Sequence, residues 1–320
     1  MSASVKSQVC QFAIDVAEGL SCAKQKKIAP RYFYDDVGSV LFEAITLLPE
    51  YGLTRADENL LRLHANDIIS ETGPLSIVAE LGSGSGRKTR HILAAVARMQ
   101  CNVLYTPIDV SGRALAACER EVCDLSEVQL VCADWIEGLQ EIARSRSGDK
   151  PLLLLFLGSS IGNLDRNEIV DFLQQVRSNL RPGDFFLLGA DLIKDVDTMI
   201  TAYDDPTGVT AAFNLNVLAR INRELDADFD LRSFAHEVRW NSEERRIEMH
   251  LLSCRNQTAC VGALDTTFEF AAGETICTEF SHKFTRSVLA SYARLSEFTP
   301  IEMWVDKSWP FAEALWQVDE

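Results

Sequence analysis

Three glycines stand at alternating positions after an apolar run, where they could form a ligand-binding loop. Gly82, Gly84 and Gly86 directly follow the run Ile77–Leu81, and a helical pattern begins near Lys88. Glycine permits a tight turn and lets a small molecule approach the backbone. A dinucleotide-binding loop would need a further glycine where this chain has Arg87. A nicotinamide-dependent oxidoreductase is therefore the weakest of the candidate functions.

Acidic residues follow the next two predicted strands. Asp109 ends the run 103–109, and Asp134 with Trp135 follows the run 128–132. A carboxylate accepts hydrogen bonds from two hydroxyls, and ligands bind at the carboxyl edge of open parallel sheets. A helix cap for Asp134 and a core position for Trp135 are the structural alternatives. The coincidence of glycines and acids at three successive strand ends favours one ligand site.

The chain between positions 70 and 191 alternates short apolar runs with helical patterns, which predicts an α/β domain. Solid apolar runs indicate parallel strands covered on both faces. We expect strands at 77–81, 103–109, 128–132, 152–157 and 185–188, and helices at 88–99, 112–122 and 168–180. The loop pattern, an acid followed by three alternating glycines, resembles the first motif of class I S-adenosylmethionine methyltransferases. The resemblance implies a Rossmann-like sheet with helices on both faces.

The remaining segments have a different pattern. Residues 1–55 are expected to be helical with a loop near 30–34, and 199–226 to form a long helical region. Alternating segments at 245–253 and 266–270 are typical of antiparallel strands. We therefore predict a second, α+β domain that interrupts the first. A helix at 287–294 and a final strand pair return to the first domain.

Composition limits the function further. The 320 residues carry 31 basic and 47 acidic side chains, a net charge of −16, which disfavours nucleic acid and anionic membranes as partners. The nine cysteines form no C-x-x-C pair, and the five histidines show no metal-ligand spacing, so we expect no metal. We expect the thiols to be reduced and mostly in the core, and the protein to be a cytoplasmic monomer without a signal sequence or membrane span.

Several longer motifs resemble those of one family, the histidine Nα-methyltransferases of ergothioneine biosynthesis. The similarity runs from about Pro30 to the C-terminus. The motifs are RYFYDDVGS at 31–39, LPEY at 48–51, FLGSSIGNL at 156–164, GADLIKD at 189–195, AYDD at 202–205, GVTAAFN at 208–214, RIEM at 246–249 and TEFS at 278–281.

This resemblance implies the trimethylation of the α-amino group of L-histidine to hercynine, with S-adenosylmethionine as methyl donor. It implies a donor-binding methyltransferase domain at 56–196 and 283–320, and a substrate-binding domain at 1–55 and 197–282, with the substrate between them. The donor-binding residues would be Gly82, Lys88, Asp109, Asp134 and Trp135. The substrate-binding residues would be Tyr51, Gly158, Asn163, Tyr203, Thr210, Phe213, Met249, Glu279 and Ser281, and the catalytic residues Tyr34 and Asn163.

The resemblance implies that Glu279 and Ser281 bind the imidazole ring of the substrate, and these contacts have a physical basis. Glu279 and Ser281 are two residues apart, so they share a face if the segment is a strand, whereas His282 would point away. A carboxylate and a hydroxyl can pair with both ring nitrogens of histidine, while an indole offers only one donor. A solvated strand face is the alternative reading of the pair from the residues alone. The open alternatives are an enzyme that methylates another aromatic amine, such as a tryptophan derivative, and a protein that binds the donor without catalysis.

The chain departs from the family at two places. Gly52-Leu53 replace an aromatic residue and a proline near the expected substrate entrance, where affinity for the substrate is expected to change. Gly86-Arg87 replace a serine and a glutamate at a helix start, which we expect to be harmless. Asp204-Asp205 are expected to cap a helix or to join a hydrogen-bond network rather than to bind a metal.

Overall fold

The computed structural model describes the backbone of residues 3–319 and the side chains from residue 11 to residue 319. The chain forms two compact units. Unit 1 comprises residues 1–52 and 194–282, and unit 2 comprises residues 53–193 and 283–320. The domain boundaries predicted from the sequence lie within three residues of these limits.

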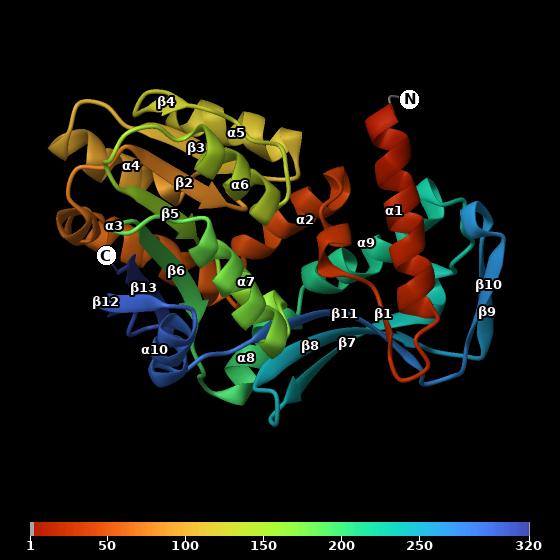
Figure 1. The fold of residues 1–320 in the computed structure, drawn as a ribbon. Coiled ribbons are helices and arrows are strands. Elements are labelled where there is room, and N and C mark those ends of the chain that lie inside the picture. The colour runs from red at the N-terminus through yellow and green to blue at the C-terminus, as the bar shows by residue number, and fades with distance from the viewer. Residues whose placement is uncertain (1–2, 320) are drawn as a thin grey trace. The chain divides into compact units, whose positions relative to one another are not determined.

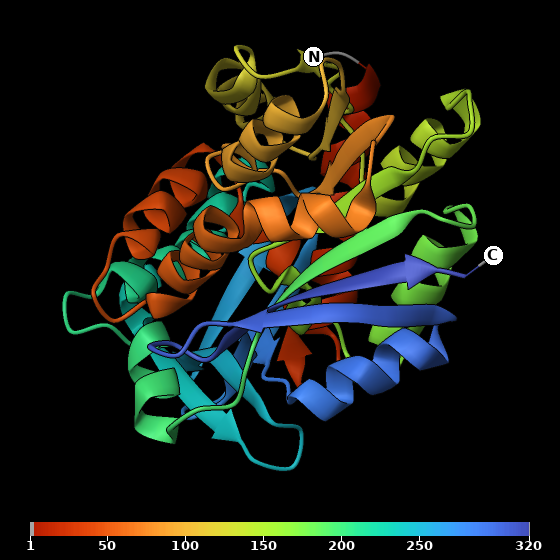
Figure 2. The same ribbon diagram turned by 90° about the vertical axis from the view of Figure 1, so that its left-hand side faces the viewer.

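Unit 2 is built on a seven-stranded sheet with the order β12-β13-β6-β5-β2-β3-β4 (Figure 1). Its strands are β2 (Ile77–Leu81), β3 (Leu104–Ile108), β4 (Glu127–Val128), β5 (Leu152–Phe156), β6 (Phe185–Asp191), β12 (Phe298–Val305) and β13 (Phe311–Val318). The first five strands in chain order pair in parallel, and β13 runs antiparallel between β6 and β12. Figure 2 shows β12 and β13 in blue beside β6 in green. This is the class I methyltransferase arrangement.

Helices cover both faces of this sheet, because its central strands carry apolar side chains on both faces. One core contains side chains of α6 (Trp135–Ser145), α7 (Arg166–Ser178) and α10 (Arg286–Leu295). The other contains side chains of α3 (Gly52–Thr72), α4 (Thr89–Met99) and α5 (Gly112–Val122). Even and odd residues of β2 belong to different cores, as the alternation of a strand requires.

The strand predicted at 128–132 is shorter than expected. The segment continues along β3 through bonds from Gln129 N to Tyr105 O (2.9 Å) and from Val131 N to Pro107 O (3.0 Å). Pro107 faces the same neighbour but has no N–H to donate, so the ladder is interrupted there.

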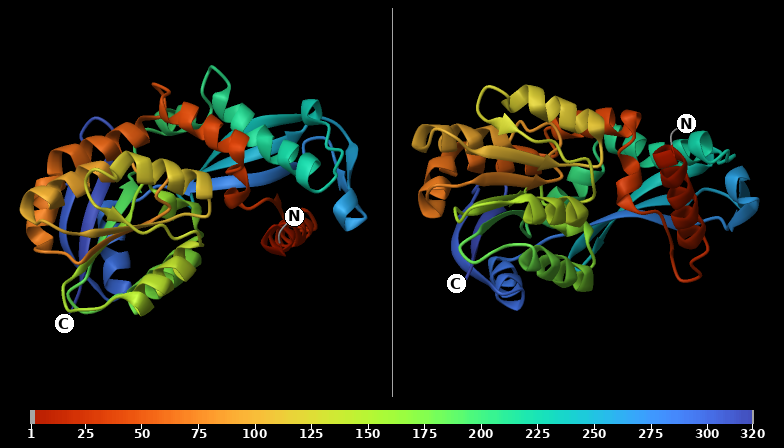
Figure 3. Two further views of the ribbon diagram at one scale, coloured as in Figure 1. Left: turned by 90° about the horizontal axis from the view of Figure 1, so that it is seen from above. Right: turned by 45° about the horizontal axis from the view of Figure 1, so that its top comes forward.

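Unit 1 is an α+β unit with a four-stranded sheet in the order β1-β11-β8-β7 and a separate hairpin. The strands are β1 (Lys26–Lys27), β7 (Phe234–Asn241), β8 (Arg246–Ser253) and β11 (Thr275–His282), and the hairpin is β9 (Gln257–Val261) with β10 (Thr266–Phe270). Its helices are α1 (Ala3–Leu20), α2 (Asp36–Thr46), α8 (Val196–Tyr203) and α9 (Val209–Glu224). Figure 3 shows α9 beside the strands β7 and β8.

Two expectations from the sequence are corrected in the structure. The helical region predicted at 199–226 is two helices, because Asp205 accepts from Val209 N (3.1 Å) and Thr210 N (2.7 Å) and so caps α9 as a separate helix. The expected capping role of Asp205 is thereby confirmed. Most cysteines are not core residues, since Cys118 alone is buried among those whose side chains are described. Cys10 lies outside the described side chains.

Candidate active site

The glycine loop follows β2 and has backbone angles that favour glycine. Gly82 and Gly86 have φ of +68° and +74°. A Cβ atom on Gly82 would lie 3.3 Å from the indole Nε1 of Trp135, and one on Gly86 would lie 2.6 Å from Cys118 Sγ. The loop therefore packs closely against α5 at Gly86, and any side chain at Gly82 would occupy the space before the indole.

Asp109 follows β3 and is tied to the glycine loop. Its Oδ2 accepts from Gly84 N (3.1 Å) and its Oδ1 from Ser111 N (2.8 Å). Burial raises the pKa of this half-buried carboxyl, although these backbone bonds lower it. A carboxylate oxygen accepts more than one hydrogen bond, so each oxygen keeps the capacity to bind a hydroxyl of a ligand.

Asp134 and Trp135 start α6, and both structural alternatives for them hold. Asp134 Oδ1 accepts from Ile136 N (3.0 Å) and Glu137 N (2.9 Å), which is a helix cap. The indole of Trp135 packs edge-on against Phe156, with ring centres 4.8 Å apart. Asp134 Oδ2 takes no part in the cap, and the Trp135 ring is half-buried, so neither role prevents contact with a ligand.

Lys88 lies at the carboxyl edge of the same sheet, next to the turn after β5. Its ammonium pairs with Asp57 of α3 and lies 3.3 Å from the position of a Cβ on Gly158. Gly158 and Ser159 have φ of +74° and +60°. The half-buried Asn163 ends the short 3-10 helix Ser160–Asn163 that follows this turn. Unit 2 thus brings its seven predicted site residues to the carboxyl ends of its parallel strands.

In unit 1, two tyrosines and a serine lie together. The hydroxyl of Tyr203, the last residue of α8, donates to Ser281 Oγ at 2.9 Å. Tyr203 is 6% and Ser281 3% exposed. The ring of Tyr51 meets that of Tyr203 edge-on, with ring centres 5.9 Å apart. Tyr51 and Ser281 are 230 positions apart along the chain, and the fold of unit 1 brings them to one place.

The strand β11 presents Glu279 and Ser281 on one face of the sheet. Glu279 lies opposite Met249 of β8 across a bulge at Thr278, and residues directly opposite each other project on the same side. Thr278 points to α9, where its hydroxyl donates to Asn214 Oδ1 at 2.7 Å. The predicted alternation is confirmed for His282, which lies opposite Arg246 and contacts Phe280 on the other face.

An aromatic group of unit 1 contains Tyr34 and Phe213. The buried Phe213 stacks on Phe33 (4.5 Å between ring centres), and Tyr34 meets Phe213 (5.9 Å) and Phe42 (5.5 Å) edge-on. Thr210 starts the same helix and is 3% exposed. Its hydroxyl lies beside the carboxylate of Asp205 and contributes to the lowered pKa of that group.

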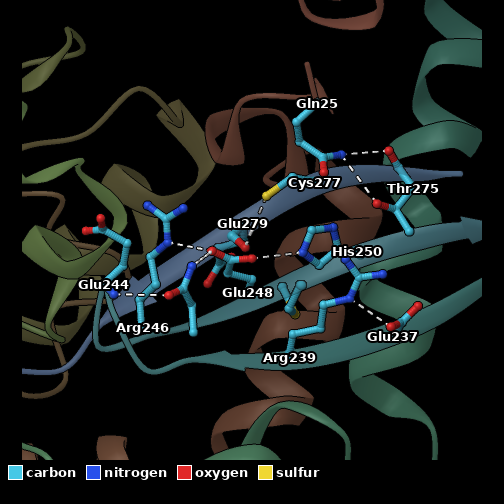
Figure 4. Close-up of polar contacts among 12 residues, drawn as sticks. Gln25, Glu237, Arg239, Glu244, Arg246, Glu248, His250, Thr275, Cys277 and Glu279 are labelled. Atoms are coloured by element: carbon cyan, nitrogen blue, oxygen red, sulfur yellow. Dashed lines mark hydrogen bonds and ion pairs between the residues drawn. The ribbon is translucent and has the colours of Figure 1, made fainter. Parts of the chain in front are cut away.

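The opposite face of the unit 1 sheet carries a ladder of charged residues (Figure 4). Glu248 accepts from Arg246 Nε (2.7 Å) and contacts His250 Nε2 (3.2 Å). The bond to His250 and the other bonds of the network lower the pKa of Glu248 to about 2. Figure 4 also draws the predicted substrate residue Glu279, whose backbone carbonyl accepts from Cys277 Sγ at 3.9 Å. We interpret the ladder of Arg246, Glu248 and His250 as structural.

Two buried acids of unit 2 were not predicted as site residues. Asp57 and Glu313 are both 0% exposed and lie near Lys88 and the Gly158 turn. Glu313 had a signal in the sequence, since it interrupts the apolar strand Phe311–Val318. Asp57 had none, because its partner Lys88 is 31 positions away.

The sequence matches one family over nearly its whole length. Residues 12–318 match the family described as histidine-specific, S-adenosylmethionine-dependent methyltransferases. The chain belongs to this family. It is therefore an enzyme that uses S-adenosylmethionine, and its class I fold agrees with that activity.

Named relatives add detail. The histidine N-alpha-methyltransferase of Mycobacterium tuberculosis is 44% identical over 305 residues, which cover 94% of this chain and 93% of that protein. The ergothioneine biosynthesis protein 1 of Schizosaccharomyces pombe is 29% identical over 81% of this chain and 35% of that protein. The 4-dimethylallyltryptophan N-methyltransferase of Claviceps purpurea is 26% identical over 62% of this chain and 57% of that protein.

Among the described residues, no helix is long and apolar enough to cross a membrane. Within the same part of the chain, no three His, Cys, Asp or Glu side chains are placed to hold a metal ion.

Proposed function

We propose that this enzyme transfers three methyl groups in succession from S-adenosylmethionine to the α-amino group of L-histidine, giving hercynine for ergothioneine biosynthesis. The observation that carries the choice of histidine is that Glu279 and Ser281 lie on the same face of β11. A carboxylate and a hydroxyl together match a ring with one donor and one acceptor nitrogen. A site built for those two bonds rejects a ring that lacks one of them.

The donor is proposed to bind unit 2. Asp109 would accept from the two ribose hydroxyls, Asp134 from the adenine amino group, and Trp135 would contact the adenine face. Lys88 would pair with the carboxylate of the methionine group, and the open Gly82 backbone would let that group approach. When bound, the donor supplies an electrophilic methyl group on a positively charged sulfur.

The substrate is proposed to bind through both the ring and the backbone of histidine. Thr210, Phe213 and Met249 would line the ring pocket that Glu279 and Ser281 define. Tyr51, Tyr203 and Asn163 would hold the α-carboxylate and the amine, and the Gly158 carbonyl would accept from the amine. Tyr34 and Asn163, the proposed catalytic residues, would contact the reacting α-amino nitrogen.

The chemistry requires a neutral amine and an in-line approach. A positive sulfur beside the amine favours its neutral form, because like charges repel. Positioning supplies much of the rate in a one-step substitution. The product is a permanent trimethylammonium group, which aromatic faces such as that of Tyr34 accommodate.

Mass spectrometry of histidine after incubation with enzyme and donor tests this proposal. We expect mass gains of one, two and three methyl groups, and no gain on Nα-acetylhistidine, whose amine is blocked. Preference for tryptophan or a prenylated tryptophan would favour the second enzyme class. The absence of any gain on histidine or tryptophan, with the donor still bound, would favour a protein that binds the donor without catalysis.

A further inference from the structure

Four ionisable side chains, three of them buried, lie together at the carboxyl edge of the unit 2 sheet. Asp57, Glu80 and Glu313 are at most 2% exposed, and the Lys88 side chain is 23% exposed. Only Lys88 has a place in the proposed function. Three acids beside one lysine need an explanation, because buried ionised groups are unfavourable unless paired.

Asp57 connects Lys88 to the Gly158 turn. Its Oδ2 accepts from the Lys88 ammonium and, at 2.9 Å, from Gly158 N. These two contacts fix the lysine head and the start of the turn on one carboxylate oxygen. The second oxygen, Oδ1, is buried and has no partner among the donors of the described residues.

Glu313 reaches the same place from β13. A Cβ on Gly189 would lie 3.1 Å from Glu313 Oε1 and 3.3 Å from Gly158 N, so the carboxyl group and the turn lie against the same point. Both Glu313 oxygens are buried and unpartnered when the group is treated as ionised. The charged groups that act on it are Asp57 of α3, Lys88 before α4 and Glu80 of β2.

A single proton on Glu313 would pair two of these three oxygens, one of Glu313 and Oδ1 of Asp57. Lys88 can neutralise one carboxylate, and a second ionised carboxylate would add an uncompensated buried charge. Burial and the neighbouring charge of Asp57 raise the pKa of Glu313 well above its usual range. A protonated Glu313 becomes a donor, and Asp57 Oδ1 is the acceptor that lacks one. Glu80 is the third acid of the group; burial raises its pKa to about 7, and it accepts from the hydroxyls of Thr89 (2.6 Å) and Tyr105.

We propose that Asp57 and Glu313 are positioning residues that share one proton, and that this carboxyl pair holds Lys88 and the Gly158 turn in the geometry that binds the methyl donor. The donor contact of Lys88 rests on the proposed function. The pair itself rests on the contacts of Asp57 and Glu313 and can be tested without any turnover.

Two amide variants of the full-length protein separate the roles of the two acids. Glu313→Gln replaces a neutral donor by another neutral donor, so we expect the dissociation constant of S-adenosylhomocysteine to stay within about twofold of that of the wild type. Asp57→Asn removes the charge that holds Lys88, so we expect that constant to rise roughly tenfold, which is about 1.4 kcal/mol. Glu302→Gln, at an exposed position of β12, is the matched control and should have no effect. Calorimetry measures all four proteins.

Infrared spectroscopy reads the proton directly, even if Asp57→Asn folds poorly. We expect the carbonyl stretch of a protonated carboxyl at neutral pH in a Glu80→Gln background, which removes the neighbouring acid whose pKa burial raises to about 7. The stretch should shift in heavy water and be absent once Glu313→Gln is added. The same band in the Glu80→Gln/Glu313→Gln double variant, or a tenfold loss of donor affinity in Glu313→Gln, would overturn the proposal. So would an unchanged donor affinity in a folded Asp57→Asn.

The two proposals fail in different ways. If histidine gains no methyl group but the infrared band and the donor affinities behave as stated, the proposed function fails and the carboxyl pair stands. If histidine is trimethylated and the band is missing, the carboxyl pair fails alone. As a further readout, Asp57→Asn should raise the KM for the donor more than the KM for histidine, whereas a loss of folding would lower only the active fraction.

Discussion

The clearest test of the donor site is the isosteric change Asp109→Asn. In the structure each oxygen of this carboxyl accepts one backbone N–H, at 3.1 and 2.8 Å, and each would receive one ribose hydroxyl when the donor binds. Asparagine retains a single oxygen, and that oxygen is uncharged. Hydrogen bonds to charged groups contribute about 1.5–3 kcal/mol and neutral ones about 0.5–1.5 kcal/mol.

The expected loss follows from those values. Weakening one hydroxyl contact and removing the other should reduce donor affinity by about 3 kcal/mol, which is roughly 150-fold. The stability of the unliganded protein should change much less. Burial raises the pKa of Asp109, so the folded state holds its ionised form at some cost, and the neutral amide removes that cost while losing one backbone bond.

Calorimetry with S-adenosylhomocysteine and thermal unfolding of the same samples measure both quantities. Asp124→Asn, on an exposed carboxylate that pairs with Arg90 in the same unit, is the matched control. A donor affinity within threefold of the wild type would refute the assignment of Asp109. An equal loss of affinity for histidine would indicate a general structural defect instead.

The remaining predictions concern histidine and pH. In calorimetry, Glu279→Ala should weaken histidine binding roughly 10- to 150-fold, the range expected for a charge-assisted bond, and should leave donor binding unchanged. Glu237→Ala, on the charged ladder, is the control. An equal loss of histidine affinity in both variants would contradict the contact between Glu279 and the ring. Thr210→Val removes a buried hydroxyl beside Asp205 and should lower the stability by about 1 kcal/mol in thermal unfolding, and it should raise the KM for histidine several-fold. An unchanged KM would remove Thr210 from the ring pocket. Donor affinity should fall as pH decreases through the raised pKa of Asp109, because only the ionised carboxylate accepts from both ribose hydroxyls. In Asp109→Asn the donor affinity should depend less on pH. A wild-type donor affinity that does not change with pH would exclude the titration of Asp109 as a cause.

The parallel half of the fold could be predicted because its signals are local. The strand Ile77–Leu81 is a continuous apolar run, and the helix Gly112–Val122 begins at Ser111, whose hydroxyl accepts from Ala114 N (3.2 Å). Turn glycines separated these elements, so their bounds in the structure match the sequence pattern. The glycine loop and the acids after the strands followed from the same local reasoning.

Features that depend on distant neighbours could not be predicted. The bulge at Thr278, which sets the direction of Glu279, depends on the pairing of β11 with β8. The break between α8 and α9, in contrast, was missed although its signals are local: Asp205 accepts from Val209 N and Thr210 N, and Pro206 stands between the two helices. The contact of Tyr203 with Ser281 joins residues 78 positions apart.

The roles of single residues came from a family resemblance rather than from the residues themselves. Without the family resemblance, the sequence would indicate a solvated strand face for Glu279 and Ser281. It would indicate ordinary core or surface residues for Tyr51 and Tyr203. The structure places the tyrosines against each other and Tyr203 against Ser281, a grouping that the sequence alone does not contain. Asp57 was missed by both routes, because a single acid on a helix of an acidic protein carries no signal.

A crystal structure with histidine and S-adenosylhomocysteine tests the central claim most directly. We predict that one ring nitrogen of histidine lies within hydrogen-bond distance of the Glu279 carboxylate and the other within reach of the Ser281 hydroxyl, with the α-amine directed at the sulfur. A ring bound away from β11, or an α-amine turned away from the sulfur, would contradict the account.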